Sequence, residues 1–496
     1  MTLSLWRRTA ACALIAFGLG CQGGFEDFSI LYFGVEIRTD DSVVVRERTQ
    51  LLIAVAPCSL PSDCLLLSSQ VQWASANPAR ATVSAQGLVA AGPDTGGVYI
   101  KVTFEPFVDS QFIRVVDRGS PRWRVELSGT VSAAAASIGF ADTATTVLVV
   151  HGGGSGSGRL RRLNLDGEQV WDVATCPAGN VAPSSAGVIV VSGPDCTRAH
   201  APAGGIELWS SGGLGDAGSA QRRVNGWIVP HIVASAGVGQ PEALVLSRIS
   251  STGAEVRRDT VFTAASIVPP SLTPAIAADG ATLLAWVDGG VPVLGAVDSL
   301  GATQFLDTLA SYPVGRSVSF GMNGTILIGT DDGLFAFDAG GVAAWSAGQA
   351  GDLVSTPAGD TEGNVYVLTA GGLVSYTSSG QQRWLADSLG SAAAGVSPAP
   401  VVLNNGELLA VCKGNRFLCW VARGTGVVLG SMDLGAQTLA TPVVADDGTV
   451  IVVLGNVGQS GTGLPALVAV YGREGPLSVG WPAEGRTSSR SRSLLP

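Results

Sequence analysis

The side chains of this chain that could carry acid–base or metal chemistry are few, because only 14% of its 496 residues are charged. Two pairs of adjacent carboxylates are the first candidates, Asp331-Asp332 and Asp446-Asp447. Such a pair can hold a divalent cation, or divide the roles of general acid and general base. Each pair directly precedes a glycine, however, and aspartate in that position favours a hairpin turn through hydrogen bonds to its own backbone. We therefore interpret both pairs as turn residues.

The histidines offer no better site. The chain has three, His151, His200 and His231, and no Cys-x-x-Cys motif that could complete a zinc site with them. We expect each of them in a solvated loop or turn. No phosphate-binding glycine loop, Ser-x-x-Lys or His-Glu-x-x-His motif occurs either. The sequence therefore predicts no catalytic residue, no metal and no cofactor, and we do not expect an enzyme.

The cysteines indicate an oxidising compartment. Cys12 lies within an N-terminal apolar segment and Cys21 directly follows that segment. The other six fall into close pairs, and an even number of paired cysteines is typical of disulfides in an exported chain. The predicted disulfides are Cys58–Cys64, Cys176–Cys196 and Cys412–Cys419. For the third pair we expect a hairpin whose two strands each place one cysteine near the other.

The N-terminus has the pattern of a secretory signal. Two arginines, Arg7 and Arg8, precede an apolar run over residues 9–19 that ends in Gly20-Cys21. This run is too short to span a bilayer. The segment resembles a bacterial lipoprotein signal, although its leucine lies two positions before the cysteine and the family prefers three. An ordinary signal peptide cleaved nearby is the alternative, and both versions export the protein.

The lipoprotein resemblance has consequences for the mature chain. It implies that residues 1–20 are removed, that Cys21 carries lipid and that residues 21–29 form a tether. Residue 22 is glutamine, not the aspartate that retains such lipoproteins in the inner membrane. We therefore expect an outer-membrane location, on the periplasmic or the surface face.

Composition excludes other classes of partner. Removal of the signal takes two arginines away and moves the net charge from −10 to −12, and the isoelectric point is about 4.9. Nucleic-acid binding needs a basic surface, so we exclude it. No later apolar run reaches 18 residues, and the basic C-terminal residues 483–496 are interpreted as a disordered tail. The sequence is compatible with a monomer.

A repeat dominates the second half of the chain. The segment from Gly324 to Trp345 is followed by a similar one from Gly363 to Trp384, and both the glycines and the tryptophans are 39 positions apart. A period near 40 that consists of strand and turn signals is typical of a β-propeller blade. The closing tryptophans, at matching positions, are predicted to be buried where one blade packs on the next.

These units resemble the repeats of the pyrroloquinoline-quinone-like (quinoprotein-like) propeller superfamily, best kept from Gly333 to Asp338 together with Trp345. The resemblance implies a propeller over residues 118–482. Division by the repeat length favours eight blades, with seven as the alternative, because residues 221–262 could not be divided into four strands. Pro121–Leu127 is predicted as an outer strand that pairs with the last blade and closes the ring.

Residues 30–117 form a separate unit. The segment from Val71 to Val89 resembles the bacterial immunoglobulin-like domains of intimin-type surface proteins, with a tryptophan strand, an Asn-Pro turn and an Ala-Thr-Val strand in that order. The resemblance implies a β-sandwich with Trp73 in its core. In the later strand, Val98, Ile100 and Val102 alternate with polar residues, which predicts a half-buried strand.

We therefore expect an all-β chain, an immunoglobulin-like sandwich followed by a propeller, and three functions compete. The first is an envelope lipoprotein whose non-catalytic propeller binds a protein or glycan partner. The second resembles an accessory lipoprotein of outer-membrane protein assembly, although that factor is a bare propeller. The third is a quinone-dependent dehydrogenase or a hydrolase that uses the central channel. Quinoprotein dehydrogenases stack the quinone on a vicinal Cys-Cys pair, which this chain lacks.

Overall fold

The structure is a computed structural model that describes most of the chain between residues 34 and 472. The described residues are 34–39, 42–46, 48–57, 64–129, 136–141, 144–152, 158–177, 180–183, 188–217, 220–223, 226–233, 242–252, 254–264, 267–268, 274–277, 279–310, 312–313, 318–321, 324–348, 355–390, 398–438, 440–455 and 464–472. The signal segment with Cys21, residue Cys58 and the basic tail lie outside these residues.

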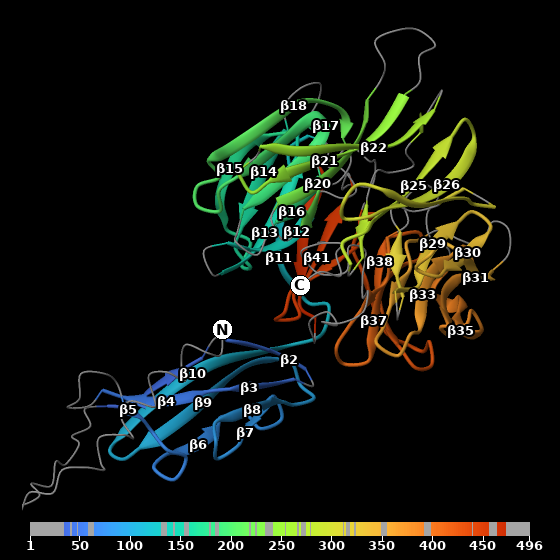
Figure 1. Ribbon diagram of the computed structural model, residues 1–496. Helices are drawn as coiled ribbons and strands as arrows, with labels where there is room; N and C mark the ends of the chain where they lie inside the picture. Colours follow the sequence, from blue (N-terminus) through green and yellow to red (C-terminus); the bar gives the residue numbers. More distant parts are fainter. Residues whose placement is uncertain are drawn as a thin grey trace, which may run out of the picture. The chain divides into compact units, whose positions relative to one another are not determined.

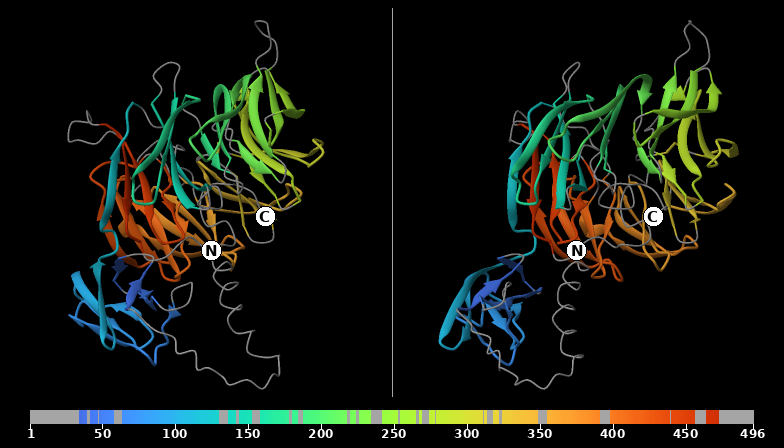
Figure 2. Two further views of the ribbon diagram at one scale, coloured as in Figure 1. Left: turned by 90° about the vertical axis from the view of Figure 1, so that its left-hand side faces the viewer. Right: turned by 60° about the vertical axis from the view of Figure 1, so that its left-hand side comes forward.

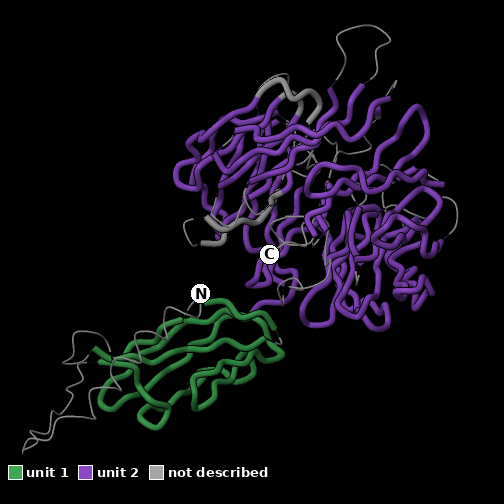
Figure 3. Tube along the Cα trace, in the orientation of Figure 1, with its two compact units in different colours: residues 1–115 green, residues 116–496 purple. Residues whose placement is uncertain are grey.

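The chain divides into two compact units, residues 1–115 and 116–496 (Figure 3). The strand pairs whose register is described are antiparallel in both units.

Unit 1 consists of three small antiparallel sheets in its described part, with strand orders β1-β4-β5, β2-β10-β9-β6 and β3-β8-β7. Their strands are β1 (Glu36–Arg38), β2 (Val43–Val45), β3 (Thr49–Leu51), β4 (Ile53–Ala56), β5 (Cys64–Leu65), β6 (Gln72–Ser75), β7 (Ala81–Val83), β8 (Leu88–Ala91), β9 (Gly96–Phe104) and β10 (Phe107–Val116).

The alternation of β9 decides which of its side chains are buried. Val98, Ile100 and Val102 are 3% exposed or less and lie in one apolar core. The residues between them, Tyr99 and Lys101, face solvent, as the period-two pattern predicted. Trp73 on β6 is partly buried and packs against the same core.

Unit 2 consists of a succession of antiparallel sheets, most of them four-stranded (Figures 1 and 2). The first three in chain order contain β12 (Ala136–Ala141), β13 (Ala144–His151), β14 (Gly158–Leu163) and β15 (Gln169–Thr175); β16 (Asn180–Pro183), β17 (Ile189–His200), β18 (Glu207–Ala217), β19 (Gln221–Arg223), β20 (Gly226–Val233), β21 (Glu242–Ser250) and β22 (Glu255–Ala264); and β23 (Ile267–Val268), β24 (Ala275–Ile276), β25 (Thr282–Asp288), β26 (Val291–Val297) and β27 (Thr303–Thr308).

Four regular four-stranded sheets complete unit 2. They contain β28 (Ser319–Phe320), β29 (Ile326–Thr330), β30 (Gly333–Phe337) and β31 (Ala343–Ala347); β32 (Ala358–Gly359), β33 (Val365–Thr369), β34 (Gly372–Tyr376) and β35 (Gln382–Ala386), followed by the 3₁₀ turn η2 (Asp387–Leu389); β36 (Val401–Val402), β37 (Glu407–Cys412), β38 (Phe417–Ala422) and β39 (Val428–Asp433); and β40 (Val443–Val444), β41 (Val450–Leu454) and β42 (Ala466–Val470) with β11 (Pro121–Glu126).

The last sheet joins the two ends of unit 2. Its order is β11-β42-β41-β40, so the first strand of the unit is the outer strand of its final sheet. The register places Trp123 opposite Ala469 and Val125 opposite Leu467. Figure 2 shows this cyan strand beside the red C-terminal strands. The predicted pairing of Pro121–Leu127 with the last sheet is confirmed, and no blade edge is left open at the join.

Every outer strand of unit 2 carries the same irregularity. Eight pairs of adjacent strands have a register shift close to the start of the outer strand, which is a β-bulge, and two of them, β17–β18 and β21–β22, have a second shift elsewhere. We call the outer-strand residue that is paired at this shift the seam residue. The eight seam residues are Trp123, Trp171, Trp209, Arg257, Phe305, Trp345, Trp384 and Gly430.

The structure agrees with the predicted disulfides that it describes, but it contradicts the prediction for the histidines. The disulfides Cys176–Cys196 and Cys412–Cys419 are confirmed, and Cys64 is disulfide-bonded. The expectation of solvated histidines is wrong for all three. They lie on β13, β17 and β20 with side chains at most 1% exposed. Both ring nitrogens of His151 and of His200 have hydrogen-bond partners, as buried polar groups usually do, whereas Nε2 of His231 is buried without a partner among the described residues.

Candidate functional site: the seams and the ring closure

The seam aromatics of one sheet pack on the next sheet through a glycine. In five seams the ring lies where a glycine side chain would begin. An added Cβ would approach a ring atom to 2.5–2.9 Å. The pairs are Trp123–Gly167, Trp171–Gly205, Phe305–Gly341, Trp345–Gly380 and Trp384–Gly426. Each glycine also has a positive φ, between 66° and 86°, in the turn before the outer strand. Only glycine satisfies both conditions without strain.

The indole N–H groups lock three of these seams. Trp123 donates to the Leu165 carbonyl at 2.6 Å, Trp171 to the Pro202 carbonyl at 2.9 Å and Trp384 to the Arg423 carbonyl at 3.0 Å. Each acceptor lies in or next to the turn that carries the seam glycine. The seam is therefore fixed by an apolar contact and by a directed hydrogen bond. Trp345 and Trp384 lie at seams as predicted, but they are half-buried rather than fully buried.

Two seams reach the same result with other residues. In the β21–β22 pair the seam residue is Arg257, and the carboxylate of Asp259 instead lies at 2.3 Å from the ideal Cβ position of Gly301. Arg248 binds Asp259 at 3.0 Å and donates to the Ser299 carbonyl of the same turn. A polar clamp therefore replaces the aromatic ring.

In the β38–β39 pair the seam residue is Gly430, and the opposing residue is Trp420. In the two preceding sheets a small residue opposes the tryptophan, as in Ala336–Trp345 and Ser375–Trp384. In the β38–β39 pair the tryptophan is therefore on the inner strand and the small residue on the outer strand. The seam still contains one indole ring.

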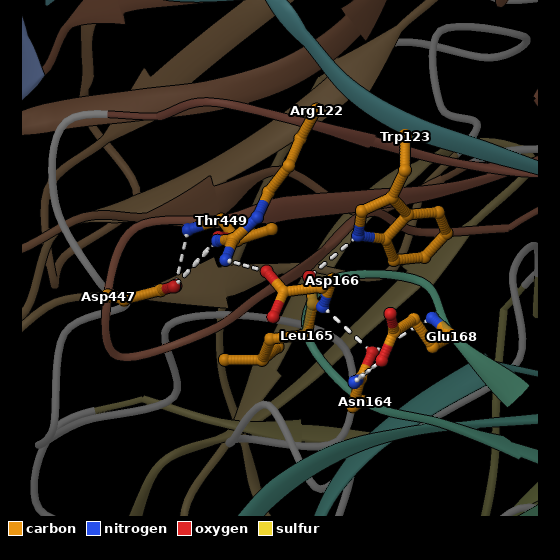
Figure 4. Close-up of polar contacts among 8 residues, drawn as sticks. All are labelled: Arg122, Trp123, Asn164, Leu165, Asp166, Glu168, Asp447 and Thr449. Atoms are coloured by element: carbon orange, nitrogen blue, oxygen red, sulfur yellow. Dashed lines mark hydrogen bonds and ion pairs between the residues drawn. The ribbon is translucent and has the colours of Figure 1, made fainter. Parts of the chain in front are cut away.

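The ring closure adds a charged clamp around Arg122. Figure 4 shows its guanidinium between two turns that are far apart in sequence. It binds Asp166 at 2.8 Å, Asp447 at 3.0 Å and the Thr449 hydroxyl at 2.6 Å. The Thr449 hydroxyl in turn donates to Asp447 at 2.9 Å. One side chain of β11 therefore ties the first sheet of the ring to the last.

The electrostatics of this clamp favour the charged form of Arg122. Its side chain is 13% exposed. Burial lowers the pKa of the guanidinium, but hydrogen bonds and charge interactions with Asp166 and Asp447 outweigh it, so the pKa of Arg122 is raised. The guanidinium also lies over the Tyr471 ring, 5.6 Å from its centroid, where a cation is attracted by the π-system.

The chain enters the ring through a turn made of two separate segments. In a continuous seam turn, the backbone N–H of Thr377 donates to the Gln381 carbonyl at 2.8 Å. The backbone N–H of Gly380 donates to the Thr377 carbonyl at 3.0 Å. At the closure, the backbone N–H of Tyr471 donates to the Ser120 carbonyl at 3.0 Å. The backbone N–H of Gly119 donates to the Tyr471 carbonyl at 2.7 Å. Tyr471 thus takes the place of Thr377, and Gly119, with φ of 81°, takes that of Gly380. We call this arrangement the split turn.

Arg118 fixes the split turn to the preceding sheet. It forms an ion pair with Glu407 at 2.9 Å. The Arg118 side chain is 13% exposed and the Glu407 side chain 8%. It also lies over the Trp420 ring, 5.4 Å from the centroid. A Cβ added at Gly119 would lie 3.2 Å from the same ring, so the split turn contacts its seam as the continuous turns contact theirs.

A Ser-His-Asp arrangement lies near the closure. Ser128 Oγ is 3.2 Å from His151 Nδ1, and His151 Nε2 is 3.3 Å from Asp172 Oδ2. A nucleophilic serine needs a histidine base oriented by a free carboxylate. Here Arg159 and Arg161 already bind Asp172, at 2.6 and 2.8 Å. The Ser128 carbonyl also lies 3.3 Å from the same Nδ1 and competes for it. The arrangement is suited to fixing the β11–β12 connection.

The charges of this cluster are held in one state near neutral pH. Burial lowers the pKa of His151, and the nearby Arg161 lowers it further. Burial raises the pKa of Asp172, but its hydrogen bonds to Arg161 and Arg159 outweigh this effect and the pKa is lowered. The neutral histidine and the ionised carboxylate are therefore the stable pair.

A second buried network surrounds Asp360. Its carboxylate accepts from the Tyr366 hydroxyl at 2.7 Å and from the Asn364 amide at 2.9 Å. Burial and the contact with Asp360 raise the pKa of Tyr366. Arg423 lies 3.9 Å from the same carboxylate, on the following sheet. The network connects adjacent sheets, as the seams do.

The carboxylate pairs singled out from the sequence are turn residues. Asp331 and Asp332 form the β29–β30 turn, and Asp446 and Asp447 the β40–β41 turn. Asp447 binds Arg122, but it accepts this bond as part of the closure. Among the described residues, no group of three or more histidine, cysteine or acidic side chains is arranged to hold a metal ion. Nor does any helix there have the length and hydropathy of a membrane span.

The comparisons with known proteins concern the fold. No protein-family model and no curated protein matches the chain. The crystal structure of BamB from Moraxella catarrhalis matches with a TM-score of 0.50 at 12% identity, over 70% of this chain and 98% of that one. A quinohemoprotein alcohol dehydrogenase from Pseudomonas putida HK5 gives a TM-score of 0.49 at 12% identity, over 73% and 77%. A streptogramin B lyase gives 0.41 at 11% identity, over 70% and 97%. The likeness to the BamB structure shows that the chain shares a β-propeller fold with it.

Proposed function

We propose that this chain is an exported, lipid-anchored envelope protein whose propeller is a non-catalytic binding platform for a protein or glycan. The observation that carries the proposal is the repeated seam contact. It fixes neighbouring sheets to each other through aromatic rings, turn glycines and, at the closure, the Arg122 clamp. Loops that project from such a fixed scaffold are well suited to recognition.

The proposal includes an eight-bladed ring. The eight bulged outer strands each define one blade, although one sheet has seven strands. Within that sheet, β18 and β20 pair only at Asp216–Ile232 and Ala217–His231. We divide it there into β16–β18 and β19–β22, which places a blade in the region 221–262 that had no clear repeat.

Unit 1 is proposed to be the immunoglobulin-like spacer in front of the propeller. Its separate core, its antiparallel sheets and the position of Trp73 support this assignment. The spacer would hold the propeller away from the membrane surface to which Cys21 attaches it. No catalytic step is needed for this role.

The main test is crosslinking in intact envelopes, followed by mass spectrometry of the captured proteins and glycans. A recurrent partner attached to propeller loops supports the proposal. The purified mature protein is also examined by mass and absorbance. A bound quinone, or turnover of an alcohol substrate on its addition, would overturn the non-catalytic assignment.

Anchoring is tested separately with Cys21→Ser. The wild-type chain is expected to begin at Cys21 and to partition into detergent with its lipid, whereas the variant remains soluble or as the precursor. A variant that fractionates like the wild type would show that no lipid is attached at this position. This result would leave the binding role of the propeller in place.

A further inference from the structure

One face of unit 1 carries side chains that its core does not use. The strands β9 and β10 form a long hairpin, and their outward residues lie opposite one another. Phe112 faces Tyr99 directly, and the rings are 5.2 Å apart in an edge-to-face arrangement. We call the surface formed by Tyr99, Lys101, Phe112 and Arg114 the hairpin face.

The two rings are unusually exposed for an aromatic pair. Tyr99 is 55% exposed and Phe112 46%. Phe112 lies across Gly97, since an added Cβ there would come within 2.4 Å of its Cζ atom. Covering a strand glycine and pairing across the sheet gives the rings a structural role in the hairpin. That role explains where the rings lie, but it does not explain the charges beside them.

Two cations flank the aromatic pair. Lys101 lies one same-face position beyond Tyr99 on β9, and Arg114 lies one beyond Phe112 on β10, in the opposite direction. Both side chains are exposed, and neither side chain forms a hydrogen bond or an ion pair in the part of the chain that the structure describes. The other outward residues of the hairpin, Thr103, Val108 and Ser110, carry no charge. The hairpin face is therefore purely cationic in a chain of net charge −10.

The spacing of these groups restricts the ligand. The two cations stand four residues apart along the strand direction, which is about 13 Å. A nucleic acid carries one charge per about 1.7 Å of duplex and needs a denser row of cations. A purely acidic peptide such as polyglutamate offers carboxylates but no apolar ring face to cover the aromatic pair. A polysaccharide with sparse carboxylates offers both the apolar C–H face of a sugar ring and separated anions.

We propose that the hairpin face binds an acidic polysaccharide, with Tyr99 and Phe112 against one sugar ring and Lys101 and Arg114 paired with carboxylates on either side. This inference goes beyond the proposed function, which places recognition on the propeller and treats unit 1 as a spacer. Arginine and lysine form charge-assisted hydrogen bonds with carboxylates, and these bonds weaken as salt rises.

The test uses the full chain and hyaluronate fragments, which carry one carboxylate per disaccharide, with binding measured by titration calorimetry. Wild type is expected to bind, and binding should weaken at least fivefold between low and physiological salt. The double variant Lys101→Gln/Arg114→Gln should lose at least tenfold in affinity while its melting temperature stays unchanged, because both side chains are exposed and unpaired. Tyr99→Ala should lose at least fivefold.

The matched control is the exposed pair Leu51 and Leu88, which face each other on β3 and β8, on another sheet of unit 1. Leu51→Ala/Leu88→Ala should bind hyaluronate like the wild type. Three results would overturn the inference: no binding of hyaluronate by the wild type, equal binding of polyglutamate, or undiminished binding by the Lys101→Gln/Arg114→Gln variant. None of these results depends on what the propeller binds.

Discussion

Removal of the Arg122 side chain should loosen the closure of the ring. Arg122→Ala takes away the contacts to Asp166, Asp447 and Thr449 and leaves two carboxylates without their cation. A hydrogen bond to a charged group contributes about 1.5–3 kcal/mol when it is shielded from water. Asp166 is 71% exposed and Asp447 40%, so screening reduces their shares to about 1 kcal/mol each. With the Thr449 bond included, we expect a loss of about 2–4 kcal/mol.

Arg416 provides the matched control. It makes two bonds of 2.8 Å to Asp433, but its side chain is 54% exposed and both residues lie in one sheet. Arg416→Ala should therefore shift the urea midpoint much less than Arg122→Ala does. The two variants remove the same side chain from similar ion pairs. They differ in whether the pair crosses the ring closure.

The assay is chemical unfolding of the full chain, combined with limited proteolysis. Arg122→Ala should lower the urea midpoint, and new cleavage should appear on either side of β11, between residues 116 and 129. Free guanidinium at low millimolar concentration should partly restore the protection by occupying the vacated site. If Arg122→Ala and Arg416→Ala shift the midpoint equally, or if cleavage is unchanged, the reasoning about the clamp is wrong.

Further predictions concern the seams, the histidines and the disulfides. Gly380→Ala should cost about 2–4 kcal/mol in a thermal melt, because its φ is 81° and its Cβ would lie 2.6 Å from the Trp345 ring; Gly406→Ala, with φ of 78° and open space around it, should cost only about 1 kcal/mol. Burial lowers the pKa values of His200 and His231 below the usual value of 6.5, so the unfolded chain binds more protons and stability should fall as pH drops below about 6.5, by at most about 1.4 kcal/mol per pH unit for each histidine. A urea midpoint that is flat from pH 7.5 to 5.5, or a His231→Gln variant with the full pH dependence, would contradict this. Non-reducing peptide mapping should recover Cys176–Cys196 and Cys412–Cys419 as pairs, and loss of the latter, which closes a loop of 7 residues, should cost about 2 kcal/mol.

The repeat was readable from the sequence partly because a glycine and an aromatic residue make the same contact in five of the eight seams. A ring that packs where a Cβ would lie requires glycine on one side and a large aromatic residue on the other, so their spacing persists. The region 221–262 gave no such signal. Its seam uses Arg257, Asp259 and Arg248 in place of a tryptophan, and no repeat search on aromatic spacing detects a polar substitute.

The ring closure could not be predicted in detail, because its contacts join distant positions. Arg122 binds one partner 44 positions away and another 325 positions away. No local pattern identifies such partners. The prediction for the histidines was wrong for a related reason. Their polarity indicated a position in solvent, but a partner such as Thr175, 2.9 Å from His200, is known only once the strands are placed.

The hairpin face could be predicted from the sequence only in part. The period-two alternation correctly placed Tyr99 and Lys101 on the outer side of their strand. Alternation along one strand does not state what the neighbouring strand contributes, however. The register that brings Phe112 opposite Tyr99 and sets Arg114 beyond it comes from the pairing of β9 with β10.

Because the chain enters unit 2 at the split turn, a force applied on the N-terminal side acts on unit 2 at its ring closure. Any pull on residues before Asp117 reaches unit 2 at the Arg118–Glu407 ion pair and at the hydrogen bonds between Gly119, Ser120 and Tyr471. A strand that is loaded from its end at a turn opens one bond pair at a time, whereas a strand loaded along its length must break its bonds together. Tension on the N-terminal side should therefore peel β11 from β42 before it disturbs the interior blades. A protein held at its N-terminus and drawn by a ligand on its propeller would open at this single place and could close again, because the remaining blades keep the partner strand in position.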